Sequence, residues 1–541
     1  MMVRRDATLP KLAWYAVIDR RADTCEAEVG RFVEVDPSPF PRWLVSGMWS
    51  GDFAAGNFHI AEHVFGSGLR IDDSEVVLVP SHTMLDRIIY AHDGGKVHAS
   101  NSLVVLLGRM GARLNPETDH RRWGESGCLG VYNYFRQFSV LHPRVDSMNQ
   151  VMFEAMHLDE KGAAAFRMHD QQHTFRGYDD YLEQLTGAVH GLWKNATDPR
   201  RARPMRAATT ASRGYDSPTI AALVRPIVGA SLISWSSQHS NTRMPWLLQK
   251  VMKTELTDDD GSEIARIVGA EPRHLDLNLR DLPAELEAWC WASTETSPEL
   301  LFHSVLEEAD GHDAPTIIFE GHGGDGVWDA QLPAGGLQAQ MTRGAPSGVS
   351  LAEARVRYGV VDCSPACMFA RSVDSIQRIS TSDEMAPWRL GNGYDRPICR
   401  RILEEKGVPR AAFGWGKKAV AQDLESPQGR ELRRLFFQRS RWTRLTERLY
   451  RNVNLGLYLG GRLASFLRLR GDRAKMMHEP FRANGKRRLA RWFNLQRRTF
   501  VLATDLLADR YEAKPAPPLG DARNQPASTF NAPRPALATA E

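Results

Sequence analysis

Residues 206–220 limit most strongly what this chain can fold into. Residues 207–211 (Ala-Ala-Thr-Thr-Ala) are small or β-branched and uncharged, which is typical of a short buried strand. The next six residues, 212–217 (Ser-Arg-Gly-Tyr-Asp-Ser), are turn-forming. Ser217 suits an N-cap, and Pro218 suits the first helical position, because proline lacks the N–H that has no partner there. The segment predicts a strand, a tight turn and a helix in succession.

The predicted turn has the chemistry of an anion site. A turn from a strand into a helix directs several backbone N–H groups and the positive end of the helix dipole at one point. Asp216 in this turn would be an odd choice for phosphate alone. It is useful if Mg²⁺ accompanies the phosphate, because this cation prefers carboxylate and phosphate oxygens together.

Residues 212–217 resemble the Ser-Gly-Gly-hydrophobic-Asp-Ser pyrophosphate loop of the asparagine synthetase family and its ATP-pyrophosphatase (PP-loop) relatives. By this resemblance Ser212, Gly214 and Ser217 would hold the pyrophosphate of ATP. Arg213 stands where the family has glycine, so it would either pair with a phosphate or crowd the loop. An ordinary turn between a strand and a helix is the alternative interpretation.

A second turn, residues 320–326 (Glu-Gly-His-Gly-Gly-Asp-Gly), follows a β-rich run at 315–320. Its glycines would allow the backbone to approach a nucleotide closely. The turn resembles the Ser-Gly-Glu-Gly-x-Asp-Glu motif of asparagine synthetases at Gly321, Gly323 and Asp325. The resemblance implies that Asp325 joins Asp216 in binding Mg²⁺ on a pyrophosphate. A flexible glycine-rich loop is the alternative.

The second turn departs from the family motif at three positions. Glu320 replaces the opening serine, His322 replaces a glutamate that is a general acid/base candidate, and Gly326 replaces the final glutamate. Histidine can carry protons near neutral pH, but it cannot copy the charge of a carboxylate. These departures put asparagine synthesis in doubt more than they do nucleotide chemistry.

A third stretch, residues 386–418, resembles the later region of the same family, where a helix leads to a Val-Pro-Arg turn and a lysine-bearing loop. Lys417 best matches the lysine that neutralises charge as an acyl-adenylate forms or is attacked, and Lys418 is the near alternative. Electrostatic stabilisation of this kind is usually the largest catalytic effect. A solvated Lys-Lys pair on the surface is the other interpretation.

Strands and helices alternate over about residues 205–430, which predicts a doubly wound parallel sheet with ligands at the carboxyl ends of its strands. An amphipathic helix is expected at 179–193. Further strands are expected at 230–236, 271–277 and 315–320, and further helices at 260–269 and 300–309. Residues 171–430 would thus form a synthetase-like ATP-pyrophosphatase domain.

Residues 1–170 look mixed and rich in strands. Short β-type runs are expected at 14–18, 31–35, 76–79 and 97–100, with a helix at 103–110 and a hairpin at 86–100. The pattern loosely resembles the N-terminal glutaminase domain of the asparagine synthetase family, an α+β domain of the Ntn type.

The glutaminases of that family use a cysteine that becomes the first residue after removal of methionine. Here position 2 is Met2, and the first cysteine is Cys25. A thiol that works with its own α-amine cannot sit at residue 25 without processing. We therefore expect a degenerate glutaminase-like domain without glutaminase activity, so ammonia would come from a separate source or a substrate amine would be the nucleophile.

Residues 431–512 form a basic extension with amphipathic stretches at 430–445 and 486–498. Arginines and aromatics interleaved in this way could contact nucleic acid or an anionic membrane surface, but helices packed on the core with solvated basic faces are favoured. Residues 513–541 are rich in Pro and Ala and are expected to be disordered.

Composition restricts the function classes only weakly. The formal net charge of +4 in 541 residues indicates no strong partner, and six unevenly spaced cysteines form no disulfide framework. Cys363 and Cys367 could share one helix face, but no second pair of metal ligands accompanies them. The N-terminus lacks an apolar signal core, and no run approaches the roughly 20 apolar residues of a membrane span. A cytoplasmic protein is expected.

Together these features predict an amide-forming ligase of the asparagine synthetase type, with ATP and Mg²⁺ as cofactors and a small-molecule or peptide carboxylate as substrate. It would release AMP and pyrophosphate through an acyl-adenylate that a nitrogen nucleophile attacks. Two alternatives remain open. One is a PP-loop enzyme that adenylates RNA, and the other is a degenerate, non-catalytic nucleotide-binding or scaffold protein.

Overall fold

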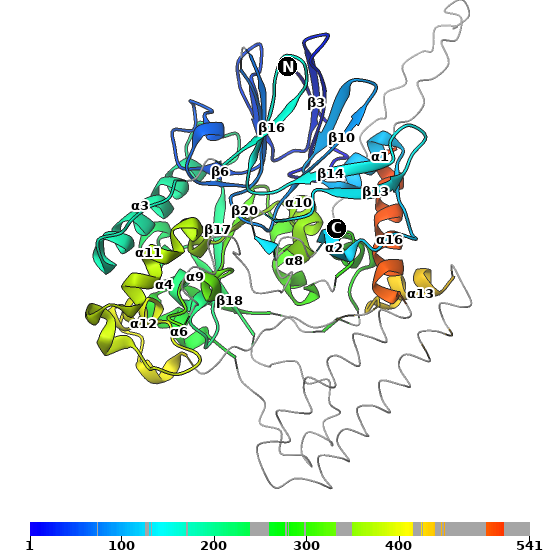
Figure 1. Cartoon of the computed structure of the whole chain (residues 1–541). Helices are drawn as coiled ribbons and strands as arrows, with labels where there is room; N and C mark the ends of the chain where they lie inside the picture. The colour runs from blue at the N-terminus through cyan, green and yellow to red at the C-terminus, as the bar shows by residue number, and fades with distance from the viewer. Residues whose placement is uncertain are drawn as a thin grey trace, which may run out of the picture.

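The computed structural model describes residues 1–72, 74–124, 129–130, 133–168, 171–237, 259–275, 278–279, 281–296, 299–331, 349–414, 424, 426–438, 445, 448 and 494–512. Within them the chain has a mixed α/β fold with several sheets, one of which is parallel (Figure 1).

Two larger sheets come from the first 167 residues. The first has the order β1-β3-β2-β11-β10-β14-β13-β12 and consists of β1 (Met2–Arg5), β2 (Trp14–Asp19), β3 (Thr24–Val29), β10 (Ile88–Asp93), β11 (Lys96–Ser100), β12 (Arg113–Leu114), β13 (Gln137–Leu141) and β14 (Ser147–Val151). The second has the order β16-β15-β9-β8-β5-β4 and consists of β4 (Glu34–Val35), β5 (Trp43–Val45), β8 (Gly68–Ile71), β9 (Val76–Val79), β15 (Ala155–Leu158) and β16 (Ala164–Arg167). A short ribbon joins β6 (Met48–Trp49) to β7 (Val64–Phe65).

Alternating side chains bury one face of each larger sheet against the other. Trp14, Ala16 and Ile18, at every second position of β2, share one apolar cluster with Leu69 of β8 and Leu78 of β9. Side chains on one face of a strand recur every two residues, so this spacing aligns them with the interior. The two sheets therefore form a packed sandwich.

The expected hairpin and helix in this region are confirmed. Strands β10 and β11 pair in antiparallel fashion around Gly94 and Gly95, whose φ angles of 60° and 85° are the left-handed values that a tight hairpin turn requires. Helix α1 (Leu103–Met110) has the predicted bounds. The run expected at 31–35 is wrong in extent, because only the two residues of β4 pair with a neighbour there.

The parallel sheet follows, with the order β19-β18-β17-β20-β21 and every neighbouring pair parallel. It consists of β17 (Arg206–Thr210), β18 (Ile233–Ser236), β19 (Glu271–His274), β20 (Thr316–Phe319) and β21 (Val360–Cys363). The first four strands were expected, and β21 was not. The chain passes outward from β17 to β19 on one side and from β20 to β21 on the other, so the order reverses between β17 and β20. Loops after those two strands must therefore face each other across the edge where ligands gather in such sheets.

Helices cover both faces of the parallel sheet, and Figure 1 shows α4 and α8 on opposite sides of its strands. Ala207 and Ala208 are successive residues of β17, and they belong to different apolar clusters. The first cluster contains Ile220 of α4, and the second contains Val305 of α8. The helices here are α3 (Tyr178–Ala196), α4 (Asp216–Val228), α6 (Ser262–Val268), α7 (Ala284–Trp291), α8 (His303–Asp310), α9 (Gly324–Val327), α10 (Ala352–Tyr358), α11 (Val373–Thr381) and α12 (Pro397–Glu405).

A buried carboxylate joins the sandwich to the parallel-sheet region. Glu353 of α10 accepts hydrogen bonds from Ser102 Oγ at 2.5 Å and from the Leu103 backbone N at 2.7 Å. These two donors stand at the start of α1, where backbone N–H groups have no partner within the helix. Glu353 is 1% exposed, so the first helix of the chain is capped from a residue about 250 positions later.

The C-terminal part of the described chain is also packed against the core. Helix α13 (Arg430–Gln438) buries Leu432 and Phe436, while α16 (Leu495–Ala508) lies alongside α1 and α7. The N-terminal region also contains the four-residue helix α2 (Arg121–Gly124). Within the expected basic stretch at 430–445, the described helix α13 packs its apolar residues on the core, in line with the favoured interpretation, while most of the stretch at 486–498 and all of 513–541 lie outside the described residues. None of the helices in the described part of the chain is both long and apolar enough to cross a membrane.

Candidate functional site at the ends of β17 and β20

Helix α4 begins two residues earlier than the sequence predicts. Its first residue is Asp216 and its N-cap is Tyr215, so neither Ser217 as N-cap nor Pro218 as the first residue is correct. Pro218 is instead the third helical residue, and the missing N–H still costs nothing, because the first four N–H groups of a helix lack internal partners. The backbone N of Thr219 makes a helical bond to Tyr215 O at 3.2 Å.

The turn before α4 is closed by its own serines. Ser212 Oγ accepts a hydrogen bond from the Gly214 backbone N at 3.1 Å and lies 3.0 Å from Ser217 Oγ. These three residues are the ones expected to hold a pyrophosphate. They therefore lie together at the N-terminus of α4, where the helix dipole favours an anion.

Arg213 is held by the segment that precedes α6. Its backbone N donates to Asp259 Oδ1 at 3.1 Å, and its Nε donates to the backbone O of Asp260 at 3.3 Å. These contacts involve protein groups alone, so both alternatives for Arg213, pairing with a phosphate and crowding of the loop, stay open. The contacts tie the loop after β17 to residues 259–260 beside the end of β18.

The glycine turn after β20 lies directly against the start of α4. A Cβ atom placed on Gly321 would lie 2.6 Å from the backbone N of Ser217, and one on Gly324 would lie 2.7 Å from Asp216 Oδ1. Both separations are far below van der Waals contact. Asp325, the residue after Gly324, is in the first turn of α9. The structure thus brings the two turns together, as expected from the strand order.

Gly323 has a φ angle of 75°, and a Cβ there would lie 2.7 Å from Cys367 Sγ. His322, between these glycines, is half-buried, and its carbonyl oxygen accepts from Ser364 Oγ and from Cys367 Sγ, the latter at 3.6 Å. These bonds hold the turn to the segment after β21. Cys367 is in a 3-10 turn and Cys363 is in β21, so the expectation of a shared helix face is wrong.

Arg396 reaches the same point from a distant segment, and the sequence did not predict a role for it. Its Nη1 donates to Asp216 Oδ1, although 180 residues separate the two. The side chain is 1% exposed and stacks its guanidinium over the Tyr394 ring at 5.0 Å. Burial lowers the pKa of Arg396, but Asp216 and Tyr394 raise it more, so the net shift is upward. The guanidinium therefore stays charged.

The donor set bears on whether Mg²⁺ and a phosphate fit here. Within the described residues no three His, Cys, Asp or Glu side chains form a group that could hold a metal ion. Asp216 also has Arg396 as a partner. The serine hydroxyls and the helix end are donors of the kind that a phosphate group takes, whereas Mg²⁺ would have to arrive with phosphate oxygens to complete its ligands.

A pair of hydrogen-bonded carboxyl groups, Glu320 and Asp362, lies at the ends of β20 and β21. Burial raises the pKa of Glu320 well above its ordinary range, and the adjoining Asp362 raises it further. Burial also raises the pKa of Asp362, against the effect of Arg355, whose Nη1 is 3.9 Å away. Arg355 also bonds to Asp86 of the sandwich at 2.8 Å. Two such groups hold a proton between them at a pH where an isolated carboxyl would lose it.

Lys417 and Lys418 lie outside the described residues, as do 415–423 generally. The last described residue before them, Gly414, is beside the first turn: its backbone N donates to Gly214 O at 3.4 Å. A Cβ on Gly414 would be 2.6 Å from the Tyr215 hydroxyl. The segment that leads to Lys417 therefore starts at the candidate site.

The region expected to be glutaminase-like has a buried cysteine. Cys25 is 7% exposed, with its side chain in the core between the two sandwich sheets. Burial raises the pKa of the Cys25 thiol to about 12. A thiol of this kind is a poor nucleophile, because the thiolate is the reactive form.

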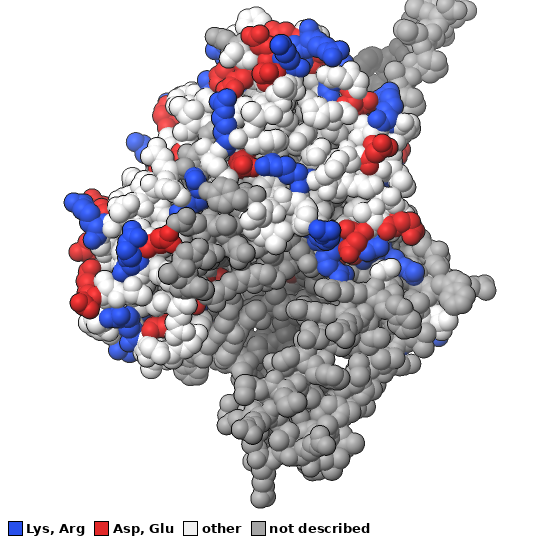
Figure 2. All heavy atoms as spheres, viewed as in Figure 1, with Lys and Arg blue, Asp and Glu red and all other residues white. Residues whose placement is uncertain are grey.

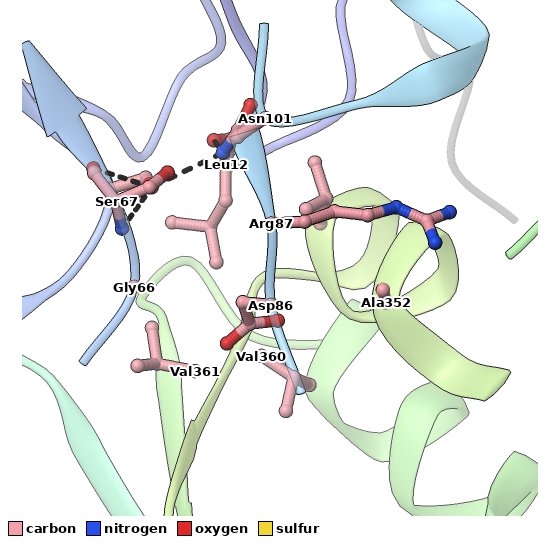
Figure 3. Close-up of a pocket in the computed structure, with 11 residues that line it drawn as sticks. Leu12, Gly66, Ser67, Asp86, Arg87, Asn101, Ala352, Val360 and Val361 are labelled. Atoms are coloured by element: carbon pink, nitrogen blue, oxygen red, sulfur yellow. Dashed lines mark hydrogen bonds between the residues drawn. The ribbon is translucent and has the colours of Figure 1, made fainter. Parts of the chain in front are cut away.

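A separate pocket lies between the sandwich and β21 (Figure 3). It is lined by Leu12, Ser46, Gly66, Ser67, Asp86, Arg87, Asn101, Ala352, Val356, Val360 and Val361. Three of its polar groups bond to one another, since Asn101 Nδ2 donates to Ser46 Oγ at 3.2 Å and Ser46 Oγ is 3.1 Å from Ser67 Oγ. No lining residue belongs to either turn, so the pocket is not part of the candidate site.

On the face shown in Figure 2, the Lys and Arg side chains of the described residues lie among Asp and Glu side chains. Arg113, for example, is paired with both Asp509 and Glu512. On this face the described residues therefore form no one-sided basic surface.

No protein-family model matches this chain, and a search of the curated proteins finds no match either.

Proposed function

We propose that this chain is an ATP-dependent, AMP-forming carbon–nitrogen ligase with a PP-loop synthetase domain and a glutaminase-like N-terminal domain that lacks the nucleophilic cysteine. The observation that carries the proposal is the meeting of two glycine-containing turns at the N-terminus of α4. Both turns follow strands on either side of the point where the strand order reverses, and that is where such sheets bind nucleotides.

In the proposed reaction, a substrate carboxylate oxygen attacks the α-phosphorus of ATP, and the bond to the β,γ-pyrophosphate breaks. Ser212, Gly214 and Ser217 would hold the leaving pyrophosphate with hydroxyl and backbone donors. Asp216 and Asp325 would hold Mg²⁺, which supplies positive charge to the pyrophosphate oxygens.

In the second half-reaction an amine attacks the acyl carbon, the bond to AMP breaks and the amine gives up a proton. Ammonia or a substrate amine would be the nucleophile. His322 is the proposed acceptor of that proton, and Lys417 would balance charge at the adenylate. Glu320, two residues before His322 in the chain, has a raised pKa and is hydrogen-bonded to Asp362; this supports proton handling at this edge of the sheet, because a neutral carboxyl group can donate a hydrogen bond.

The test is release of AMP and pyrophosphate from Mg-ATP, with and without a mixture of cellular metabolites. Asp216→Asn should abolish release, and Asp383→Asn, on the exposed 3-10 segment after α11, is the matched control that should retain it. Release that is equal in both variants would exclude this site as the source. No release under any condition, with no ATP binding, would contradict the proposal.

One observation favours a second candidate, a nucleotide-binding protein without turnover. The ion pair between Arg396 and Asp216 neutralises a carboxylate that would otherwise bind Mg²⁺. That protein would bind ATP in a calorimeter and release neither AMP nor pyrophosphate with any carboxylate supplied.

A further inference from the structure

The backbone around Arg396 is fixed by hydrogen bonds, so its charged side chain has a defined position in the candidate site. Its backbone position is set on both sides: the Asp395 carbonyl accepts from the Ala330 N at 2.9 Å, and the Arg396 carbonyl accepts from the Arg400 N at 3.0 Å. Asp395 also fixes the loop before it, since its Oδ2 accepts from the backbone N of Leu390 at 2.8 Å. These hydrogen bonds therefore position the guanidinium of Arg396 beside Asp216.

At least one N–H donor of the Arg396 guanidinium has no hydrogen-bond partner among the described residues. An arginine has five N–H donors in a planar fork that matches phosphate oxygens. Arg396 Nε is buried and has no hydrogen-bond partner among the described residues. A buried donor without a partner is costly, so an acceptor that arrives with a ligand would be favoured there.

The neighbours of Arg396 are those that an anion would meet. Asp216, its ion-pair partner, opens helix α4, whose N-terminus attracts negative charge. The ring of Tyr394 lies under the guanidinium, and a Cβ atom on Gly214 would be 3.2 Å from the Tyr394 hydroxyl. Arg396 is thus adjacent to the loop proposed to hold pyrophosphate.

We infer that Arg396 is a pyrophosphate-binding residue, and that Asp216 occupies its guanidinium only until the anion arrives. This inference rests on the proposed function, in which the site takes ATP and releases pyrophosphate. Asp216 and pyrophosphate therefore compete for the guanidinium of Arg396. When Mg²⁺ enters with the anion it gives Asp216 a new partner, and Arg396 is then available to the phosphate oxygens.

The competition predicts opposite effects for the two partners, which a purely supporting arginine would not produce. Without metal, Asp216→Asn should tighten the binding of pyrophosphate, because the internal competitor is gone. Arg396→Gln should weaken it by about tenfold, the usual loss for one charge-assisted hydrogen bond. Arg396→Lys keeps the charge but not the planar fork, so it should fall between the wild type and Arg396→Gln.

The experiment is calorimetric titration of the full chain with sodium pyrophosphate, once in EDTA and once with Mg²⁺. Arg378→Gln, on the exposed side of α11, is the matched control for loss of one positive charge and should bind as the wild type does. Circular dichroism melting checks that each variant is folded. If Arg396→Gln does not fold, Asp216→Asn and Arg396→Lys still decide the matter.

Unchanged pyrophosphate affinity in folded Arg396→Gln, or weaker metal-free binding in Asp216→Asn, would overturn the inference. So would an absence of pyrophosphate binding by the wild type in both buffers. Arg396-dependent binding without AMP release would uphold the inference and remove the proposed function. Release of AMP, together with pyrophosphate binding that does not depend on Arg396, would uphold the proposed function and overturn the inference about Arg396.

Discussion

Gly321 has no room for a side chain. In Gly321→Ala the new Cβ would collide with backbone atoms of Asp216 and Ser217, which cannot swing away as a flexible side chain can. We expect the start of α4 to shift, with a loss of about 1–3 kcal/mol in the free energy of unfolding and loss of pyrophosphate binding. Denaturant unfolding and calorimetry measure the two effects.

Gly187→Ala is the control for this substitution. Gly187 lies within α3, and a Cβ there would meet nothing within 4 Å. Alanine is the better helix former, so this variant should be more stable by about 0.5–1 kcal/mol. Equal behaviour of Gly187→Ala and Gly321→Ala would show that the two turns are not in close contact.

Cys25 should be inert in the folded protein. Its thiol is buried and its pKa is raised to about 12, so almost no thiolate is present at pH 8. Iodoacetamide should leave Cys25 unmodified in the native state and alkylate it in guanidinium chloride, as peptide mass spectrometry would show. Rapid native alkylation of Cys25 would contradict the assignment of this region as lacking a nucleophile.

At the residue scale, residues whose role depends on their neighbours in the chain could be predicted, whereas contacts between residues far apart in the chain could not. Both turns were predicted from their serines, glycines and aspartates, because turn chemistry is encoded within a few neighbouring residues. Arg396 was missed as a site residue: it meets Asp216 only through the fold, 180 residues away along the chain. Glu320 was noticed solely as a departure from a motif, and nothing local indicates that Asp362 is its partner.

At the scale of single elements, Glu287 of α7 connects that helix to α13. Its carboxylate accepts from the backbone N of Gln428 at 2.5 Å and of Gly429 at 2.9 Å, and from Trp291 Nε1 at 3.3 Å. Burial raises the pKa of Glu287 to about 7, although these donors act in the opposite direction. The start of α13 therefore depends on a carboxyl group that titrates near neutral pH.

Titration of Glu287 predicts how stability changes with pH. Between its ordinary value near 4.5 and about 7, the folded chain keeps a proton that the unfolded chain has lost. The contribution of Glu287 to stability is thus fully present below pH 4.5 and declines as pH rises to 7, by on the order of 3 kcal/mol. Glu287→Gln cannot titrate, so the difference in unfolding free energy between wild type and variant should change over that interval. A constant difference would show that burial does not shift this group.

Elements with strong local patterns were predicted well. Strand β9 is apolar throughout, β17 is small or β-branched after Arg206, and α1 and α3 have clear helical spacing. Strand β21, which is as long as β9, was missed because it contains Asp362, a residue type depleted in strands, whose carboxyl group is accommodated there by contacts with Glu320 and Arg355. Strand β4 is only two residues long, so its own sequence gives little strand signal. The early start of α4 likewise reflects contacts with the glycine turn that the local sequence does not reveal.

At the scale of the whole molecule, Glu353 holds the sandwich to the parallel-sheet region. Glu353→Ala would leave the buried Ser102 hydroxyl and the Leu103 N–H without an acceptor. Each unmet buried donor costs about 1–3 kcal/mol, so the expected destabilisation is about 3 kcal/mol or more. Urea unfolding followed by fluorescence measures it.

Ser102→Ala removes the hydroxyl that donates to Glu353 and that accepts from the Val105 backbone N, but it leaves the Leu103 bond to Glu353 intact, so it should cost about 1–2 kcal/mol, less than Glu353→Ala. The two variants together separate the carboxylate from the hydroxyl. Equal losses in Ser102→Ala and Glu353→Ala would show that the backbone bond contributes little to joining the two regions.

The packing of α16 on α1 has a consequence for the synthesis of the chain. Gly108 is so close to Ala508 that a Cβ there would lie 2.5 Å from its carbonyl oxygen, and Arg109 donates to the Tyr511 carbonyl at 3.0 Å. Roughly 400 residues must therefore leave the ribosome after α1 before its partner helix exists. At about 5–20 residues per second this is on the order of 20–80 s, during which one side of α1 stays uncovered and open to chaperones.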